Sequence, residues 1–377
     1  MDCAYFDAGV CHSCASIGLP IPVQRASKFE RARQAVRVAE RMREAAWLPT
    51  FGGPESGFRN KAKMVIGGSA DAPTLGILDA GQRGVDLREC GILLPGLRAV
   101  QPALAAFITL ARLVPYDVRA RRGELKHIIT TESPDGELMV RFVLRSTESL
   151  ARIRKHLPAL LRAAPGIRVV TANIHPTHSA VLEGAEEVVL TEQSALPIRM
   201  NGLELRLPPR SFFQTNTGVA AALYRQASEW TARLAPAPAR IVDLYCGVGG
   251  FALSLAGEGR EVIGVETSED AIEAARATAE RNGVAAAFTA GDARHWVGAA
   301  DLVVVNPPRR GLGPELTATL EHSSVPIVLY SSCNPDTLAR DLELMPSYRA
   351  VEARCFDMFP QTEHLEVMVL LERAPVG

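Results

Sequence analysis

A regular alternation of strand-like and helix-like segments fills the chain after Pro238. Strands that alternate with helices build a mostly parallel sheet with helices on both faces. We therefore predict an α/β, Rossmann-like domain at the C-terminal end. Its expected strands are the apolar runs at 241–244, 261–266, 302–305, 325–331, 349–356 and 366–371, and its longest expected helix is 268–282.

A glycine-rich turn follows the first of these strands. Asp243 opens the run Asp-Leu-Tyr-Cys-Gly-Val-Gly-Gly, and its glycines let the backbone approach a ligand closely. Glu266 ends the next strand, where a carboxylate can accept hydrogen bonds from ribose hydroxyls. A dinucleotide site is the rival interpretation. The D-x-x-x-G-x-G form, with Asp292 after the third strand, favours S-adenosylmethionine, and Asp292 would then lie near the adenine amine.

Cys333 lies just past the apolar run at 325–330, in the sequence Tyr-Ser-Ser-Cys-Asn-Pro. A thiol at the carboxyl end of a strand in such a sheet points into the crevice where these sheets hold ligands. A buried and inert thiol is the alternative, since free cysteine is among the most buried residue types. Its place on the same sheet as the cofactor turn favours a nucleophile.

Length and charge suggest how the chain is organised. With 377 residues it can form two or three domains, which we expect at 1–48, 49–200 and 201–377. Residues 1–200 hold 26 Lys and Arg against 20 Asp and Glu, whereas residues 201–377 hold 15 against 22. The first half can therefore present a basic face to a polyanion. Basic residues recur along one predicted helix, at Arg25, Lys28, Arg31, Arg33, Arg37, Arg41 and Arg43.

The chain shows no sign of a membrane location. No apolar stretch is long enough to span a bilayer, and the first residues lack the basic and apolar regions of a signal peptide. We therefore expect a cytoplasmic protein with no membrane partner.

Four cysteines form a possible metal site. Cys3, Cys11 and Cys14 have C-x7-C-x2-C spacing, and Cys90 can complete a set of four thiolates. The odd total of seven cysteines in a cytoplasmic protein favours metal or catalytic use over disulfides. Four thiolates suit either structural zinc or an iron–sulfur cluster, and the spacing alone leaves both open.

Several motifs together carry a family resemblance. They are Ser211-Phe212-Phe213-Gln214-Thr215-Asn216, the turn from Asp243 to Gly250, Asn306-Pro307-Pro308-Arg309-Arg310, Ser331 to Pro335, Phe356-Asp357-Met358-Phe359-Pro360 and His364-Leu365-Glu366. With these motifs the chain resembles the S-adenosylmethionine-dependent RNA uracil-C5 methyltransferases over essentially its full length. Within that family it is most similar to the branch that acts on uridine 747 of bacterial 23S rRNA. Two features favour this branch: the chain begins at Cys3 without a preceding β-barrel RNA-binding domain, and Asn306 replaces the usual aspartate.

The resemblance implies roles for particular residues. Cys333 would be the nucleophile and Glu366 the general base. The α+β central domain would carry a [4Fe–4S] cluster and bind 23S rRNA, and we expect a monomer with no obligate protein partner. The residues implied to bind S-adenosylmethionine are Gln214, Tyr245, Glu266 and Asn306, and those implied to hold the cluster are Cys3, Cys11, Cys14 and Cys90.

Other functions remain open at this point. The same chemistry on tRNA uridine 54 or on 23S rRNA uridine 1939 is one alternative, and a non-catalytic or redox iron–sulfur RNA-binding protein is another. Phe212 and Phe213 can stack on a base or fill the core, and we expect core packing for both.

Overall fold

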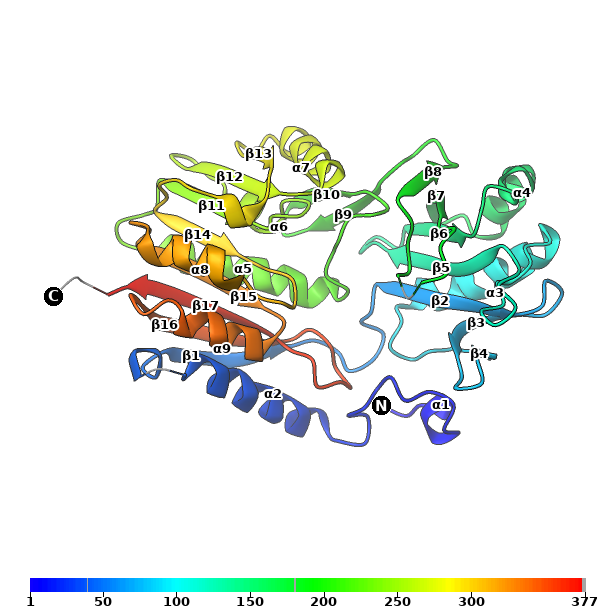
Figure 1. Cartoon of the computed structure of the whole chain (residues 1–377), viewed down its shortest axis with the longest axis horizontal. Helices are drawn as coiled ribbons and strands as arrows, with labels where there is room; N and C mark the ends of the chain where they lie inside the picture. Colours follow the sequence, from blue (N-terminus) through cyan, green and yellow to red (C-terminus); the bar gives the residue numbers. More distant parts are fainter. Residues whose placement is uncertain (39, 180, 375–377) are drawn as a thin grey trace. The chain divides into compact units, whose positions relative to one another are not determined.

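The computed structural model describes residues 1–38, 40–179 and 181–374 (Figure 1). The chain divides into two compact units. Unit 1 comprises Met1–Cys14 and Ser56–Arg199, and unit 2 comprises Ala15–Glu55 and Met200–Gly377. In the part of the chain that the structure describes, none of the helices has the length and apolar character needed to cross a membrane.

Unit 1 is built on a seven-stranded sheet with the order β4-β3-β2-β5-β6-β7-β8. Neighbouring strands run antiparallel except β6 and β7, which are parallel because helix α4 connects them. One face of the sheet packs against helices α3 and α4 in a core centred on Leu104, Phe142 and Ile153. The elements of this unit are α1 (Ala4–Asp7), β2 (Lys61–Gly68), β3 (Pro73–Leu78), β4 (Gly84–Asp86), α3 (Pro95–Leu110), β5 (Leu125–Glu132), β6 (Leu138–Leu144), α4 (Leu150–Ala163), β7 (Ile167–Ile174) and β8 (Glu186–Val189).

Unit 2 is built on an eight-stranded sheet with the order β1-β16-β17-β15-β14-β11-β12-β13. Its strands are parallel except β17, which runs antiparallel to both β15 and β16. The strands are β1 (Ala46–Gly52), β11 (Arg240–Leu244), β12 (Glu261–Glu266), β13 (Ala287–Ala290), β14 (Leu302–Val305), β15 (Ile327–Ser332), β16 (Tyr348–Asp357) and β17 (Glu366–Arg373). The helices are α2 (Ile21–Val36), η1 (Glu40–Met42), α5 (Thr217–Arg233), α6 (Gly250–Leu255), α7 (Glu269–Asn282), η2 (Ala293–His295), α8 (Gly313–His322) and α9 (Pro335–Glu343). Strands β9 (Leu196–Met200) and β10 (Leu203–Leu207) form a separate two-stranded sheet.

The helices of unit 2 begin and end where the sequence provides caps. The Ser268 hydroxyl accepts a hydrogen bond from Ala271 N at the start of α7, and Gly283 ends that helix in the left-handed conformation. Asn216 and Asn334 cap α5 and α9 in the same way, and Pro335 occupies the first position of α9. These caps fix the points at which each helix leaves the sheet.

The N-terminal segment joins the C-terminal sheet, which the sequence patterns did not predict. Strand β1 pairs in parallel with β16, and Trp47 lies opposite Ala353. Helix α2 contributes Ala32 and Val36 to the core that covers the same sheet. Residues 15–55 are therefore part of the fold of unit 2.

The strand order brings several chain segments to one edge of the sheet. The order reverses between β11 and β14, and ligands of such sheets bind outside the carboxyl ends of the strands at this switch point. Strands β11, β12, β14 and β15 all end at this edge. Because β17 runs in the opposite direction, it begins there. The predicted α/β, Rossmann-like sheet is confirmed by this topology.

Candidate active site

The predicted nucleophile lies at the carboxyl edge of the unit 2 sheet. Cys333 follows β15 directly and precedes α9, and its side chain is partly buried. Burial raises the pKa of the Cys333 thiol, and the negative charge of Glu366 raises it further. The Arg309 guanidinium opposes this shift through its charge and a hydrogen bond, so it lowers the pKa of the thiol. Thiolates form more readily near a cation and a helix N-terminus.

Arg309 is held near Cys333 through its backbone. The Asn334 side-chain Nδ2 donates a hydrogen bond to Arg309 O at 3.0 Å, and Asn334 also caps α9. The loop that carries Asn306 and Arg309 is thereby attached to the turn that carries Cys333. The motif pattern alone gave no reason to distinguish Arg309 from surface charge.

The predicted general base is at the start of β17. Glu366 is only 1% exposed, and burial raises the pKa of its carboxyl to about 7. The Ser331 hydroxyl donates a hydrogen bond to Glu366 Oε1 at 2.5 Å, which opposes that rise in pKa. A carboxylate with a pKa near neutrality is a stronger base than an ordinary glutamate and is still partly ionised at pH 7.

The glycine-rich turn connects β11 to α6. Tyr245, Gly247 and Gly249 have φ values of 67°, 53° and 89°, so the backbone turns through three left-handed residues. The Glu266 carboxylate accepts a hydrogen bond from Gly247 N at 3.2 Å and from Thr267 N at 2.8 Å. Glu266 therefore lies against the glycine-rich turn.

Asp243 is fully buried at the end of β11. Its Oδ2 accepts a hydrogen bond from Ala252 N at 2.9 Å, whereas its Oδ1 has no partner among the residues that the structure describes. Burial raises the pKa of the Asp243 carboxyl to about 7. A buried oxygen without a partner is costly, and it marks a place where a ligand or water can donate a hydrogen bond.

The other predicted cofactor residues lie in connections that follow strands. Asn306 follows β14 and is partly buried, and Gln214 lies buried between β10 and α5. Asp292 caps η2 and forms an ion pair with Arg294 at 2.5 Å. The hydrogen bond from Arg294 lowers the pKa of Asp292 to about 2.

Comparisons with known proteins identify the family. The sequence is 43% identical to the 23S rRNA (uracil(747)-C(5))-methyltransferase of Shewanella loihica over 99% of each chain. It is 45% identical to the enzyme of the same description from Cronobacter sakazakii, over 99% of this chain and 100% of the relative. The chain belongs to the 23S rRNA (uracil(747)-C(5))-methyltransferase family.

Two family models and one solved structure support the assignment of the chain as a methyltransferase related to uracil-C5 enzymes. Residues 298–374 match the tRNA (Uracil-5-)-methyltransferase family model, and residues 227–321 match the Methyltransferase small domain model. The crystal structure of the Pyrococcus abyssi tRNA (uracil-54, C5)-methyltransferase in complex with S-adenosyl-L-homocysteine is 28% identical. It has a TM-score of 0.79 and covers 95% of this chain and 85% of that chain.

The four cysteines of the predicted cluster all belong to unit 1. Glu89 N donates a hydrogen bond to the Tyr5 hydroxyl at 3.1 Å, so α1 lies beside the segment that carries Cys90. Burial, followed by the charges of Cys90, Cys11 and Cys3, raises the pKa of Cys14 to about 11. Among the described residues, however, no group of three or more His, Cys, Asp or Glu side chains is arranged to hold a metal ion. The [4Fe–4S] cluster therefore stays a prediction.

The expectation for the two phenylalanines is half wrong. Phe213 is 5% exposed and packs in the interior, as expected, but Phe212 is 69% exposed. Phe212 lies in the segment between β10 and α5 and precedes Gln214 by two residues. Adjacent residues of an extended segment point in opposite directions, so only one of the pair can face the core.

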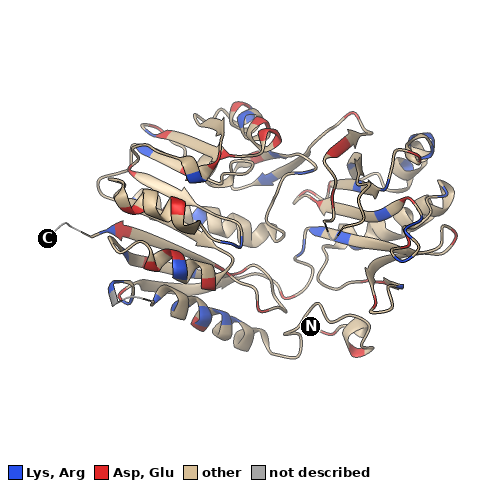
Figure 2. Cartoon of the chain, viewed as in Figure 1, with Lys and Arg blue, Asp and Glu red and all other residues tan. Residues whose placement is uncertain are grey.

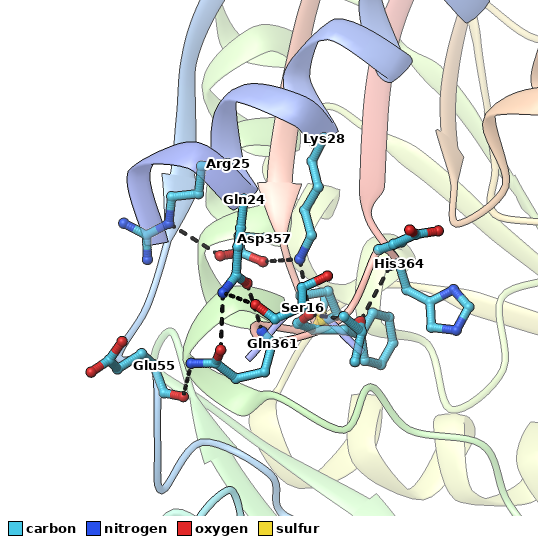
Figure 3. Close-up of polar contacts among 12 residues, drawn as sticks. Ser16, Gln24, Arg25, Lys28, Glu55, Asp357, Gln361 and His364 are labelled. Atoms are coloured by element: carbon cyan, nitrogen blue, oxygen red, sulfur yellow. Dashed lines mark hydrogen bonds and ion pairs between the residues drawn. The ribbon is translucent and has the colours of Figure 1, made fainter. Parts of the chain in front are cut away.

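A buried polar network on α2 was also missed (Figure 3). Lys28 was expected on a basic surface, yet its Nζ lies 2.6 Å from Asp357 Oδ1 and the two side chains are 2% and 0% exposed. Arg25 forms a second ion pair with Asp357 at 3.1 Å. Lys and Arg residues recur along α2 (Figure 2). Arg31 on this helix and Arg37 at its C-terminal cap remain exposed. Basic spacing along a helix does not show which side chain has a buried acidic partner.

The same network fixes the segment that leads to Glu366. Gln24 Nε2 donates to Gln361 Oε1 at 2.9 Å, and Gln361 N donates back to Gln24 Oε1 at 2.9 Å. Lys28 Nζ also donates to Phe359 O at 2.9 Å, and Asn216 Nδ2 donates to Met358 O at 3.3 Å. The connection between β16 and β17 is thereby held from two sides.

Proposed function

We propose that this chain transfers a methyl group from S-adenosylmethionine to C5 of uridine 747 in 23S rRNA. The observation that carries the proposal is the meeting of Cys333, Glu366 and the glycine-rich turn at one edge of the sheet. Full-length relatives at 43–45% identity are described as enzymes for this reaction.

Cys333 begins the proposed reaction. Uracil C5 is a poor nucleophile, and addition of the Cys333 thiolate to C6 converts the C5–C4–O4 unit into an enolate. Bound S-adenosylmethionine supplies an electrophilic methyl group, which C5 takes up. Arg309 assists the first step by favouring the thiolate form of Cys333.

Glu366 completes the proposed reaction. After methylation C5 carries both a methyl group and a proton. Glu366 removes that proton, the C5–C6 double bond re-forms, and the Cys333 thiolate leaves as the electron pair returns to sulfur. A pKa of about 7 suits the carboxylate to this task at neutral pH.

The cofactor is proposed to bind along the switch point of the sheet. Glu266 would accept hydrogen bonds from the ribose hydroxyls, and Tyr245 would present its ring next to the turn. Gln214 and Asn306 would contact the cofactor from the two flanking segments. Asp292 would reach the adenine amine while it keeps its ion pair with Arg294.

A [4Fe–4S] cluster is proposed for Cys3, Cys11, Cys14 and Cys90. The proposal is supported by the chemistry of four thiols within unit 1 and by the hydrogen bond that holds α1 beside the Cys90 segment. Zinc would use the same four thiolates. The methyl transfer consumes no electron, so the cluster would serve to fix residues 1–14 within unit 1.

The target uridine can be tested directly. We expect the purified enzyme to methylate a 23S rRNA fragment that contains uridine 747, and not fragments that contain uridine 1939 or tRNA uridine 54. Incorporation of labelled methyl groups, mapped by mass spectrometry of nuclease fragments, measures this. Cys333→Ala should incorporate none. Methylation of another uridine would reassign the substrate, and no methylation of any RNA would favour the non-catalytic RNA-binding alternative.

Since the substrate is ribosomal, we place the enzyme in the cytoplasm.

A further inference from the structure

Ser331 makes a buried contact with the proposed base. It is the next-to-last residue of β15, is completely buried, and lies opposite Met368 in the antiparallel pairing with β17. Its hydroxyl donates to Glu366 Oε1 at 2.5 Å. Within the described residues it is the one hydrogen-bond donor to this carboxylate, and Glu366 Oε2 accepts none.

Among the described residues, no cation contributes to the shift in the pKa of Glu366, which comes from burial and the bond from Ser331. The ionisable side chains that interact electrostatically with it are Tyr224 on α5, Cys333 after β15 and Cys355 on β16. A cation beside the carboxylate would hold it ionised but would also reduce its basicity. A neutral hydroxyl can orient the carboxylate with a smaller loss of basicity.

We propose that Ser331 is a positioning residue that holds Glu366 through Oε1 so that Oε2 takes the proton from C5. This inference rests on the proposed function. The single bond fixes the rotation of the carboxyl group, and it leaves the lone pairs of Oε2 free to accept the proton. When Oε2 is protonated, Oε1 becomes the carbonyl oxygen and still accepts from Ser331, so the contact persists through the step.

The chain provides a matched control one residue away. The Ser332 hydroxyl donates to Asn334 O at 3.0 Å and accepts from Asn334 N at 3.2 Å, so it supports the turn and does not touch Glu366. Ser332→Ala removes the same atom as Ser331→Ala from a neighbouring buried position. Ser331→Thr keeps a hydroxyl at the site.

The test follows single-turnover methylation of the uridine 747 fragment by rapid quenching. Denaturing gels separate the covalent protein–RNA adduct from released methylated RNA. For Ser331→Ala we expect methyl transfer to continue while release of the adduct slows by about tenfold, so that the adduct accumulates. The bond from Ser331 favours the ionised carboxylate, so its loss should also move the pH midpoint of the release step upward. Ser331→Thr should restore both the release rate and its pH midpoint. Ser332→Ala should leave the pH midpoint of the release step unchanged.

The outcomes separate this inference from the proposed function. If Ser331→Ala releases the methylated RNA at the wild-type rate and with the wild-type pH midpoint, Ser331 does not have the proposed role, although covalent catalysis by Cys333 still holds. A midpoint shift of the same size in Ser332→Ala would overturn it too, since the effect would then be general to the strand. If wild-type enzyme forms no adduct at all, the proposed function fails and the inference with it. Thermal unfolding of each variant confirms that the fold is intact.

Discussion

Removal of Lys28 should destabilise unit 2, because the buried Asp357 carboxylate is then left without its closest cation. Lys28→Met keeps most of the aliphatic volume but leaves the buried Asp357 carboxylate without its closest cation at 2.6 Å. Breaking a buried pair by removing one partner usually costs about 3–5 kcal/mol. Arg25 still pairs with Asp357, although it is 29% exposed. We therefore expect a loss of about 3 kcal/mol in the free energy of unfolding, the lower end of that range.

Chemical denaturation followed by tryptophan fluorescence measures this loss. The three tryptophans, Trp47, Trp230 and Trp296, all belong to unit 2, so the signal reports that unit alone. The matched control is Arg33→Met on the same helix, because the Arg33–Glu30 pair is 37% and 44% exposed. An exposed pair contributes about 0–1 kcal/mol.

Two results would refute the reasoning about this pair. One is a denaturation midpoint for Lys28→Met that is no lower than the midpoint for Arg33→Met, with the same dependence of the unfolding free energy on denaturant. The other concerns the double variant Lys28→Met with Asp357→Asn, which removes both charges and should recover part of the loss. No recovery would show that packing, and not the stranded charge, sets the cost.

Three further predictions concern the site and its surroundings. Burial raises the pKa of Glu366 to about 7, so release of the methylated RNA from Cys333 should speed up as the pH rises through 7 and level off above it. A release rate that does not change between pH 6 and 8 in single-turnover assays would contradict the assignment of Glu366 as the base. Cys90→Ser should abolish iron binding, whereas the control Cys246→Ser should retain it. Metal and sulfide analysis of anaerobically purified protein measures this. Equal iron content in the two variants would show that Cys90 is not a ligand of the cluster. Phe212→Ala should weaken RNA binding by about tenfold with unchanged stability if the exposed ring stacks on a base. Phe213→Ala should instead destabilise the fold by about 3–5 kcal/mol, and unchanged RNA affinity in Phe212→Ala would exclude stacking.

The sequence was most informative where local pattern and chemistry coincide. The alternation of strands and helices after Pro238 predicted the parallel core of the sheet, and strand ends predicted where Cys333, Glu266 and Asn306 lie. A parallel sheet places the carboxyl ends of its strands at one edge, whatever the connections between the strands are. The positions of these three residues could therefore be predicted from the alternation of strands and helices.

Long-range pairings were beyond the sequence patterns. Strand β1 has a proline at position 49 and no clean alternation, and only its pairing with β16 makes it a strand. Lys28 looked like its exposed neighbours because its acidic partner is more than 300 residues away. Ser331 looked like an ordinary strand residue, and only the antiparallel β17 brings Glu366 within reach of its hydroxyl.

The central claim is that the Cys333 sulfur bonds to uracil C6 before methyl transfer. RNA with 5-fluorouridine at position 747 tests this claim most directly. A base can remove a proton from C5 but cannot remove fluorine, so the methylated adduct should be trapped. With S-adenosylmethionine present, mass spectrometry of the digested complex should find the methylated fluorouridine attached to the peptide that contains Cys333, and Cys333→Ala should give no complex. A trapped nucleotide on any other residue, or wild-type turnover by Cys333→Ala, would contradict the account.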